Sequence, residues 1–324
     1  MARKEDLKLM YRIACRYYLD QVQQVEIAKL EGVSRSTVSR MLEKARAGGM
    51  VRVEVNMPVE LDVSKLEREL AKALGLRRAV VAPVSESVND AAHEERIMLQ
   101  TAAIAGAYLP RLLQGSRYVG LGWGRTLYEA ADRLPEIKAG EQKFFVPMVN
   151  NYSRHCRYMQ TSTIVSRFCD KFDSEGFYLN ISDPSHKRGE RNESELENIR
   201  QLCVYWDMLD AAVLSFSSPR QLLINPYYID VWQGGIDIGD PDEKEMLFES
   251  MGQVFYANGS YYGVNRNFDM ISMDLQRLKE IDNVICLGAG IGKAETLIAA
   301  GRGGFYKTLI VDHLTAEAML KMLK

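Results

Sequence analysis

The chain has 324 residues, of which 47% are hydrophobic and 26% charged, so disordered, collagen-like and disulfide-scaffold proteins are excluded and two domains are expected. The net charge of −2, taken alone, argues against a nucleic-acid partner, because such proteins present a basic surface. Residues 1–56, however, carry 11 Lys and Arg against 7 Asp and Glu, whereas residues 57–324 carry 30 against 36. This change of sign along the chain indicates different partners for the two parts.

Three helices are predicted at the amino terminus. Apolar residues recur at helical spacing over residues 6–20, a second helix follows over 24–30, and a third spans 35–46 after the capping residue Ser34. The spacing of four small or apolar residues is typical of a helix-turn-helix, in which two helices cross closely around a tight turn. These residues are Ile27, Ala28, Gly32 and Val38.

The third helix has a face of Arg, Ser and Thr with no acidic residue before Glu43. In a major groove, Arg reads guanine edges, and hydroxyl groups reach bases or phosphates. The side chains that we expect to contact double-stranded operator DNA are Ser34, Arg35, Ser36, Thr37, Ser39, Arg40, Lys44, Arg46 and Arg52. Arg52 lies in an alternating segment, residues 51–55, which predicts a strand and a possible wing. The alternative is a surface helical hairpin whose charges are merely solvated.

Residues 57–77 are predicted to link this DNA-binding domain, residues 1–56, to the rest of the chain. After Pro58, residues 61–74 form a helix with Leu and Ala on one face. That face could belong to a core or to a self-association surface. Because helix-turn-helix proteins usually bind two half-sites as dimers, we favour association.

Residues 78–324 alternate short apolar strands with helical segments. The predicted strands are 79–81, 118–121, 144–148, 284–287 and 308–312. This alternation predicts an α/β domain with a parallel sheet that binds ligands at the carboxyl ends of its strands.

Two glycine-rich junctions, residues 120–127 and 284–293, join a strand to a helix. Glycines there allow backbone N–H groups to approach an anion, and the helix dipole favours phosphate. Neither junction matches a nucleotide motif, since Arg125 and Lys293 stand where glycine would be needed. The candidate effector-binding residues are Gly122, Trp123, Gly124, Arg125, Thr126, Gly288, Gly290 and Lys293. The alternative is that both junctions are tight turns that pack a helix against the sheet.

Taken together, these motifs resemble the SorC type of bacterial sugar-responsive transcriptional regulators, over about residues 7–320. The resemblance rests on residues 34–42, 122–127 and 293–316. It implies a winged helix-turn-helix domain joined to a Rossmann-like α/β effector domain related to sugar-phosphate isomerases, assembled as a homodimer or homotetramer. It also implies control of a carbohydrate or polyol utilisation operon by a small sugar, sugar phosphate or polyol.

Some segments depart from the family pattern where the pocket is expected. Residues 150–158 and 215–218 replace glycine-rich stretches, and residues 178–184 replace a more apolar strand end. Some relatives carry a Schiff-base lysine after the strand 144–148, and this chain has none there, so a covalent adduct is not expected. Whether the effector is phosphorylated stays open, and the changes could also be ordinary loop variation.

No cofactor, metal or membrane is expected as a partner. The five cysteines lack a C-x-x-C pair, and no apolar run reaches the roughly 18 residues of a membrane span, so we expect free thiols in a cytoplasmic protein. His155 beside Cys156 has no second ligand pair at zinc-site spacing.

Two other functions are alternatives to a regulator. A sugar-phosphate isomerase or lyase with an attached helical domain would need a proton-transfer group such as Glu295, Asp312 or His313, and no nucleophile–base spacing supports it. We therefore expect no enzymatic activity. An architectural DNA-binding protein with a ligand-blind domain is the third hypothesis.

Overall fold

The computed structural model describes residues 2–51, 63–85, 93–137, 141–150, 158, 160–179, 191–217, 247–256, 258, 260–264 and 271–324. The chain divides into two compact units, an amino-terminal unit, Met1–Pro58, and a larger unit, Val59–Lys324.

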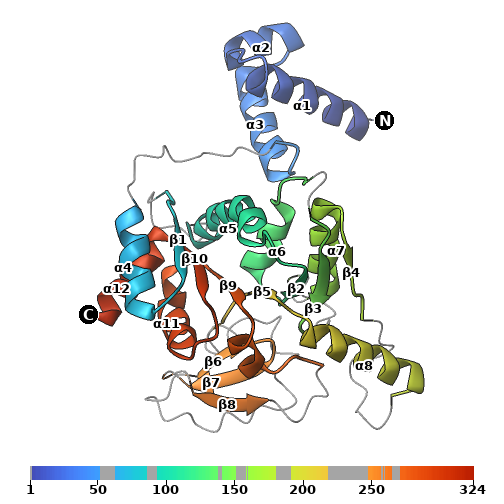
Figure 1. The fold of residues 1–324 in the computed structure, drawn as a ribbon. Helices are drawn as coiled ribbons and strands as arrows, with labels where there is room; N and C mark the ends of the chain where they lie inside the picture. Colours follow the sequence, from blue (N-terminus) through green and yellow to red (C-terminus); the bar gives the residue numbers. More distant parts are fainter. Residues whose placement is uncertain are drawn as a thin grey trace. The chain divides into compact units, whose positions relative to one another are not determined.

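The amino-terminal unit contains three helices, α1 (Ala2–Tyr18), α2 (Gln24–Glu31) and α3 (Arg35–Ala47) (Figure 1). They enclose a small core made of Ile13, Ala14, Ile27, Ala28, Val38, Leu42 and Ala45. Gly32 ends α2 with φ of 66°, the left-handed conformation that glycine adopts without strain. The predicted helix-turn-helix is therefore present, whereas Arg52 and most of the predicted strand 51–55 lie outside the described residues.

Two ion pairs fix α1 against α2. The Glu31 carboxylate lies 2.9 Å from the Arg12 guanidinium and 3.0 Å from that of Arg16. The single carboxylate offsets one of the two positive charges and holds the helices together.

The larger unit is built on a seven-stranded sheet in the order β1-β10-β9-β5-β2-β3-β4, in which every pairing is parallel. The strands are β1 (Arg78–Ala82), β2 (Tyr118–Leu121), β3 (Phe144–Pro147), β4 (Glu175–Gly176), β5 (Ala211–Leu214), β9 (Asn283–Gly288) and β10 (Thr308–Asp312). The predicted parallel α/β architecture is confirmed.

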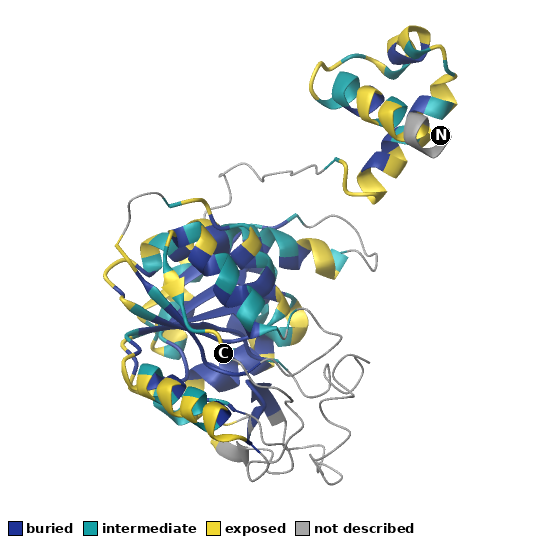
Figure 2. Ribbon diagram, turned by 90° about the vertical axis from the view of Figure 1, so that its right-hand side faces the viewer, coloured by how far each residue is buried: buried dark blue, intermediate teal, exposed yellow. Residues whose placement is uncertain are grey.

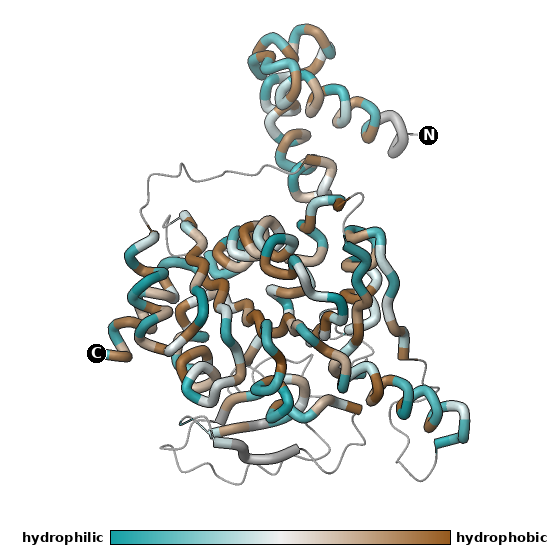
Figure 3. Tube along the Cα trace, in the orientation of Figure 1, coloured by the Kyte–Doolittle hydropathy of each residue, from teal (hydrophilic) through white to brown (hydrophobic). Residues whose placement is uncertain are grey.

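Helices cover both faces of this sheet, which explains why its central strands are apolar on both sides (Figures 1 and 3). One face carries α5 (His93–Leu112), α6 (Arg125–Asp132) and α7 (Thr161–Phe172). The other carries α4 (Ser64–Leu74), α8 (Glu193–Asp207), α11 (Ala294–Arg302) and α12 (His313–Leu323). Buried residues accordingly concentrate on the strands and on the inner faces of the helices (Figure 2).

The apolar face of α4 belongs to the core of the larger unit, which corrects our preference for self-association. Leu70 is fully buried, and Leu66 and Leu74 pack against the same cluster of core residues. The helix contacts β1 and α12. Its leucines are thus already covered within one chain and are not left for a partner.

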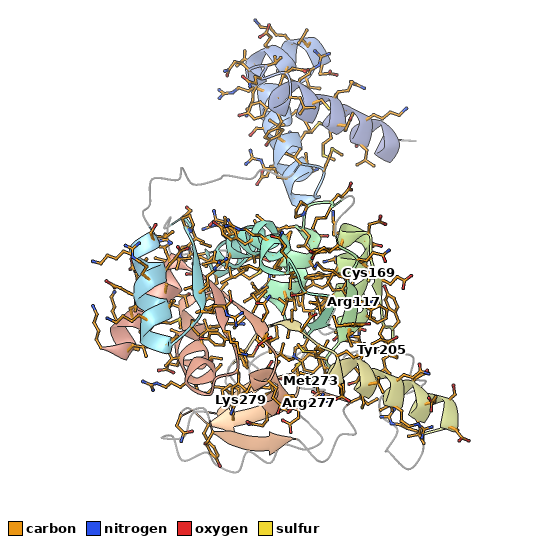
Figure 4. The ribbon with its side chains drawn as sticks, viewed as in Figure 1. Arg117, Cys169, Tyr205, Met273, Arg277 and Lys279 are labelled. Atoms are coloured by element: carbon orange, nitrogen blue, oxygen red, sulfur yellow. The ribbon has the colours of Figure 1, made fainter. Side chains whose placement is uncertain are left out.

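A smaller antiparallel sheet adjoins the main sheet and consists of β6 (Leu247–Ser250), β7 (Gln253–Tyr256) and β8 (Tyr261–Val264). The segment before β9 carries Met273, Arg277 and Lys279 (Figure 4) and includes the short 3-10 helix η3, Leu275–Lys279. The Met273 N–H donates to the carbonyl of Met148 at 2.8 Å, so this segment holds the end of β3 in place.

Over the described residues, no helix combines the length and the apolar character needed to cross a bilayer. In the same part of the chain, no three His, Cys, Asp or Glu side chains gather as metal ligands do. His155 and Cys156 lie outside the described residues.

Candidate DNA-binding face and effector site

The start of α3 is held by a capping arrangement. Ser34 Oγ accepts the backbone N–H of Thr37 at 3.1 Å and lies 2.8 Å from the hydroxyls of both Ser36 and Thr37. Ser34 and Thr37 are therefore occupied in positioning the helix, so two of the predicted DNA contacts have a structural role as well.

The outer face of α3 carries the remaining predicted contacts. Val38, Leu42 and Ala45 turn inward and are buried. The exposed side chains are Arg35, Ser36, Ser39, Arg40, Glu43, Lys44 and Arg46. The face is therefore basic, with one acidic side chain, and has the polar chemistry that DNA recognition needs.

Two arginines of this face have contacts within the unit. Arg40 Nε lies 3.4 Å from the carbonyl of Ser36, one turn earlier on α3. The Arg46 guanidinium carbon lies 5.8 Å from the centre of the Tyr18 ring, a cation–π distance. Both side chains are exposed, so their charge is directed to solvent.

The larger unit has a topological switch point between β2 and β5. From β2 the chain proceeds through β3 and β4 to one edge of the sheet, whereas from β5 it proceeds through β9 and β10 toward the other. Open α/β sheets bind ligands at the carboxyl ends of the strands at such a point. The first glycine junction follows β2, and the second follows β9.

The glycines of the first junction do not leave their N–H groups free for an anion. The Gly122 N–H donates to Val213 O at 2.9 Å, and the Gly124 N–H donates to Tyr158 O at 3.1 Å. Trp123 is 5% exposed and belongs to the core. The two glycine N–H groups are therefore used within the turn and are not available to bind an anion. This corresponds to the alternative stated above, a tight turn that packs a helix against the sheet.

Arg125 and Thr126 open helix α6 at this junction. Thr126 is buried, whereas Arg125 is exposed, forms an ion pair with Glu95 and lies 5.5 Å from the centre of the Tyr158 ring. The first N–H groups of any helix lack partners within it. The start of α6 is thus where this junction can meet a polar ligand.

The second junction is clamped by a buried aspartate. Asp312 Oδ2 accepts the Gly290 N–H at 2.8 Å, and the same carboxylate caps α12 through Thr315. A Cβ atom at Gly288 would lie 2.6 Å from Leu297 Cδ1, so glycine is needed there for α11 to pack on β9. Gly288 and Gly290 are therefore structural residues, and Lys293 is the member of this junction that can act on a ligand.

Lys293 interacts electrostatically with a buried carboxylate, Glu249 of β6. Burial raises the pKa of Glu249 to about 7, an effect opposed by the Gly252 N–H, at 2.7 Å from Oε1, and by Lys293. Burial also lowers the pKa of Lys293, an effect opposed by Cys286 and Glu249. Glu249 did not emerge from the sequence, because no local pattern marks a carboxylate on a short strand as buried beside a distant lysine.

Both junctions contact the residues that follow β5. A Cβ atom at Gly124 would lie 3.1 Å from Ser215 Oγ. Lys293 Nζ donates to Phe216 O at 3.1 Å, and Ser217 exchanges two backbone hydrogen bonds of 2.8 Å with Glu249. The structure therefore brings the two predicted junctions together around the end of β5, with Glu249 added from the smaller sheet.

Residues 60–321 match the family model described as "Putative sugar-binding domain". The chain belongs to this family. The sorbitol operon regulator of Klebsiella pneumoniae is 24% identical, over 99% of this chain and all of that protein. The transcriptional regulator LsrR of Escherichia coli is 26% identical, over 96% of this chain and 93% of that protein.

Solved structures of regulators share the fold of this sugar-binding family member. The full-length sorbitol operon regulator SorC of K. pneumoniae aligns with a TM-score of 0.66 at 23% identity, covering 97% of this chain and 99% of that one. A DeoR family transcriptional regulator of Listeria monocytogenes gives 0.61 at 20% identity, covering 79% and 99%. The resemblance to SorC-type regulators is confirmed.

Proposed function

We propose that the protein is a transcriptional regulator that binds double-stranded operator DNA and whose DNA affinity is controlled by a small sugar, sugar phosphate or polyol. Its target is a carbohydrate or polyol utilisation operon, and its place of action is the cytoplasm. One observation carries the proposal: a helix-turn-helix with an exposed basic face is joined, in one chain, to a domain of the sugar-binding family.

In the DNA-binding role, Arg35, Ser36 and Arg40 read base edges, with Ser39 beside them on the same helix. Lys44, Arg46 and Arg52 contact the DNA phosphates. Ser34 and Thr37 keep the first turn of α3 in shape through the cap described above. A homodimer or homotetramer would present the paired helices that two operator half-sites require.

In the effector role, Arg125, Thr126 and Lys293 are the proposed contacts, because they have polar side chains at the switch point. A ligand controls DNA affinity only if it binds one arrangement of the protein better than another. The end of β5, which both junctions contact, is where such a ligand would act.

The structure gives the isomerase or lyase alternative little support. Glu295 is exposed, and the Asp312 carboxylate is occupied by Gly290 and Thr315. His313 accepts the Val84 N–H through Nδ1 at 3.1 Å. These three groups have structural or solvent partners, and the relatives reported above are regulators.

The test is a fluorescence-anisotropy titration of the full chain on DNA from upstream of its own gene, with and without a panel of sugars, polyols and their phosphates. We expect sequence-specific binding that at least one member of the panel changes. Binding that no member alters, together with no thermal shift by any member, would favour a ligand-blind architectural protein. Turnover of a pentose or hexose phosphate by the pure protein would favour the enzyme.

A further inference from the structure

Three buried side chains at the carboxyl end of the main sheet have no hydrogen-bond partner in the part of the chain that the structure describes. The atoms without a partner are Nδ2 and Oδ1 of Asn150, Oγ1 of Thr161 and Oγ of Ser215. Their residues are 2%, 0% and 5% exposed, so bulk solvent does not satisfy them. A buried polar group without a partner costs free energy, and such groups in a folded protein call for an explanation.

All three lie around the first glycine junction. Asn150 follows β3 and Ser215 follows β5, the strands on either side of β2, so they flank the turn that leaves β2. Ser215 closely approaches Gly124, whose N–H donates to Tyr158 O, and Thr161 begins α7 shortly after that tyrosine. Three separate segments thus bring unsatisfied polar groups to the switch point.

Some buried polar side chains elsewhere in the larger unit have partners, whereas Thr296 Oγ1 and Asp210 Oδ1, in the same described part of the chain, lack one. Gln253 donates through Nε2 to Met273 O at 2.7 Å and accepts the Leu275 N–H at 2.9 Å. Thr101 donates to Ile97 O at 2.7 Å. Asn150, Thr161 and Ser215 are distinguished by their positions, since they follow β3, begin α7 and follow β5, around the turn that leaves β2.

The chemistry of these side chains indicates which ligand groups could form the missing hydrogen bonds. Each is uncharged, and each can both donate and accept a hydrogen bond, which is also the capacity of a hydroxyl group. A phosphate offers mainly acceptors and requires positive charge, which Lys293 and Arg125 supply and these residues do not.

We propose that Asn150, Thr161 and Ser215 form a subsite for the hydroxyl groups of a sugar or polyol and determine which arrangement of hydroxyls binds. The proposal rests on the proposed function and deepens it. In the ligand-free protein the subsite is energetically costly, and bound hydroxyls offset that cost. A site built around polar groups discriminates strongly against ligands that leave those groups unpaired.

The test uses the full-length variants Asn150→Leu, Thr161→Val and Ser215→Ala, with Gln253→Leu and Thr101→Val as controls whose side chains are hydrogen-bonded. The unfolding temperature of each free protein is measured first. The subsite variants are expected to unfold at the wild-type temperature or above, because removing an unpartnered group costs little. Both controls are expected to unfold at lower temperatures.

Binding is then measured by calorimetry with erythritol, xylitol, sorbitol, ribose, glucose, fructose and the corresponding phosphates. For a compound that binds the wild type, each subsite variant is expected to lose about tenfold in affinity or more, whereas Thr101→Val keeps it. Subsite variants that unfold as early as the controls, or that keep wild-type affinity, would overturn the subsite and leave the regulatory function standing. A wild type that binds none of these compounds would overturn both.

Discussion

Lys293 Nζ donates a hydrogen bond to the main-chain carbonyl of Phe216, which ties the second glycine junction to the end of β5. The first junction meets the same segment, where Gly124 approaches Ser215. Parts of the chain that are far apart in sequence therefore share one polar region, in which a cation and a carboxylate are both perturbed by burial.

Replacing the Lys293 ammonium should separate the response to an effector from DNA binding. Lys293→Met is expected to abolish the response of operator binding to an anionic effector while DNA binding itself persists, since the positive charge lies in the larger unit. The measurement is anisotropy on operator DNA across the sugar-phosphate panel. Lys143→Met is the control, because its ammonium is also buried and bonded to carbonyls, at 2.8 Å from Leu113 O and Ser116 O, but lies before β3 at the opposite end of the sheet. An unchanged response in Lys293→Met would remove Lys293 from the site.

Glu249 should make stability depend on pH. Its folded pKa of about 7 is raised from the ordinary value of 4.5, so the folded state binds the proton more tightly than the unfolded state. The stabilisation is therefore complete below pH 4.5 and is lost as the pH rises through 7. Relative to the wild type, Glu249→Gln should gain about 3 kcal/mol in unfolding free energy between pH 4.5 and pH 8. Urea denaturation across this range measures it, and parallel curves for the two proteins would contradict the raised pKa.

Arg40→Ala should weaken operator binding by about 1 to 3 kcal/mol and relax the base preference at one position, because an arginine that reads a base edge contributes both. Anisotropy with the operator and with a set of single-base variants measures the two effects. The control is Lys65→Ala, an exposed lysine of the larger unit. Wild-type affinity and preference after Arg40→Ala would show that this side chain does not read the operator.

Lys44→Ala is expected to behave differently. A phosphate contact carries no base information, so affinity should fall by a similar factor on operator and random DNA, and the slope of log affinity against log salt should decrease by about one. Titrations at several salt concentrations give this slope. A loss confined to the operator sequence would instead assign Lys44 to base reading.

Ser34→Ala should destabilise the first turn of α3 by about 1 kcal/mol, because the cap to the Thr37 N–H is lost. Hydrogen exchange of residues 35–40 measures the change. Ser39→Ala is the matched control: its side chain is exposed beyond the first turn, so stability should change by less than about 0.5 kcal/mol. Equal exchange rates in the two variants would show that the cap does not stabilise the helix in solution.

Local patterns predicted the three amino-terminal helices and the strands β1, β2, β3, β9 and β10, because the small residues Ala28 and Gly32 and the alternation of apolar strands with helices depend on near neighbours. The strands β4 and β5 and the smaller sheet were not predicted. The roles of the glycines were harder to predict. Nothing local distinguishes a free N–H from one already bonded, and the Gly290 N–H is taken by Asp312, which lies on another strand. Glu249 was missed for the same reason, since its burial beside Lys293 exists only after the smaller sheet has docked.

The carboxylate of Asp312 bonds to two neighbouring parts of the larger unit. It holds the loop around Gly290 and also begins α12, the helix on which α4 rests. Helix α4 is the first described helix after the boundary at Pro58, and it packs on α12, whose first turn shares the Asp312 carboxylate with the loop around Gly290. A shift of that loop would therefore change either its hydrogen bond with Asp312 or the position of the first turn of α12, the helix that packs on α4.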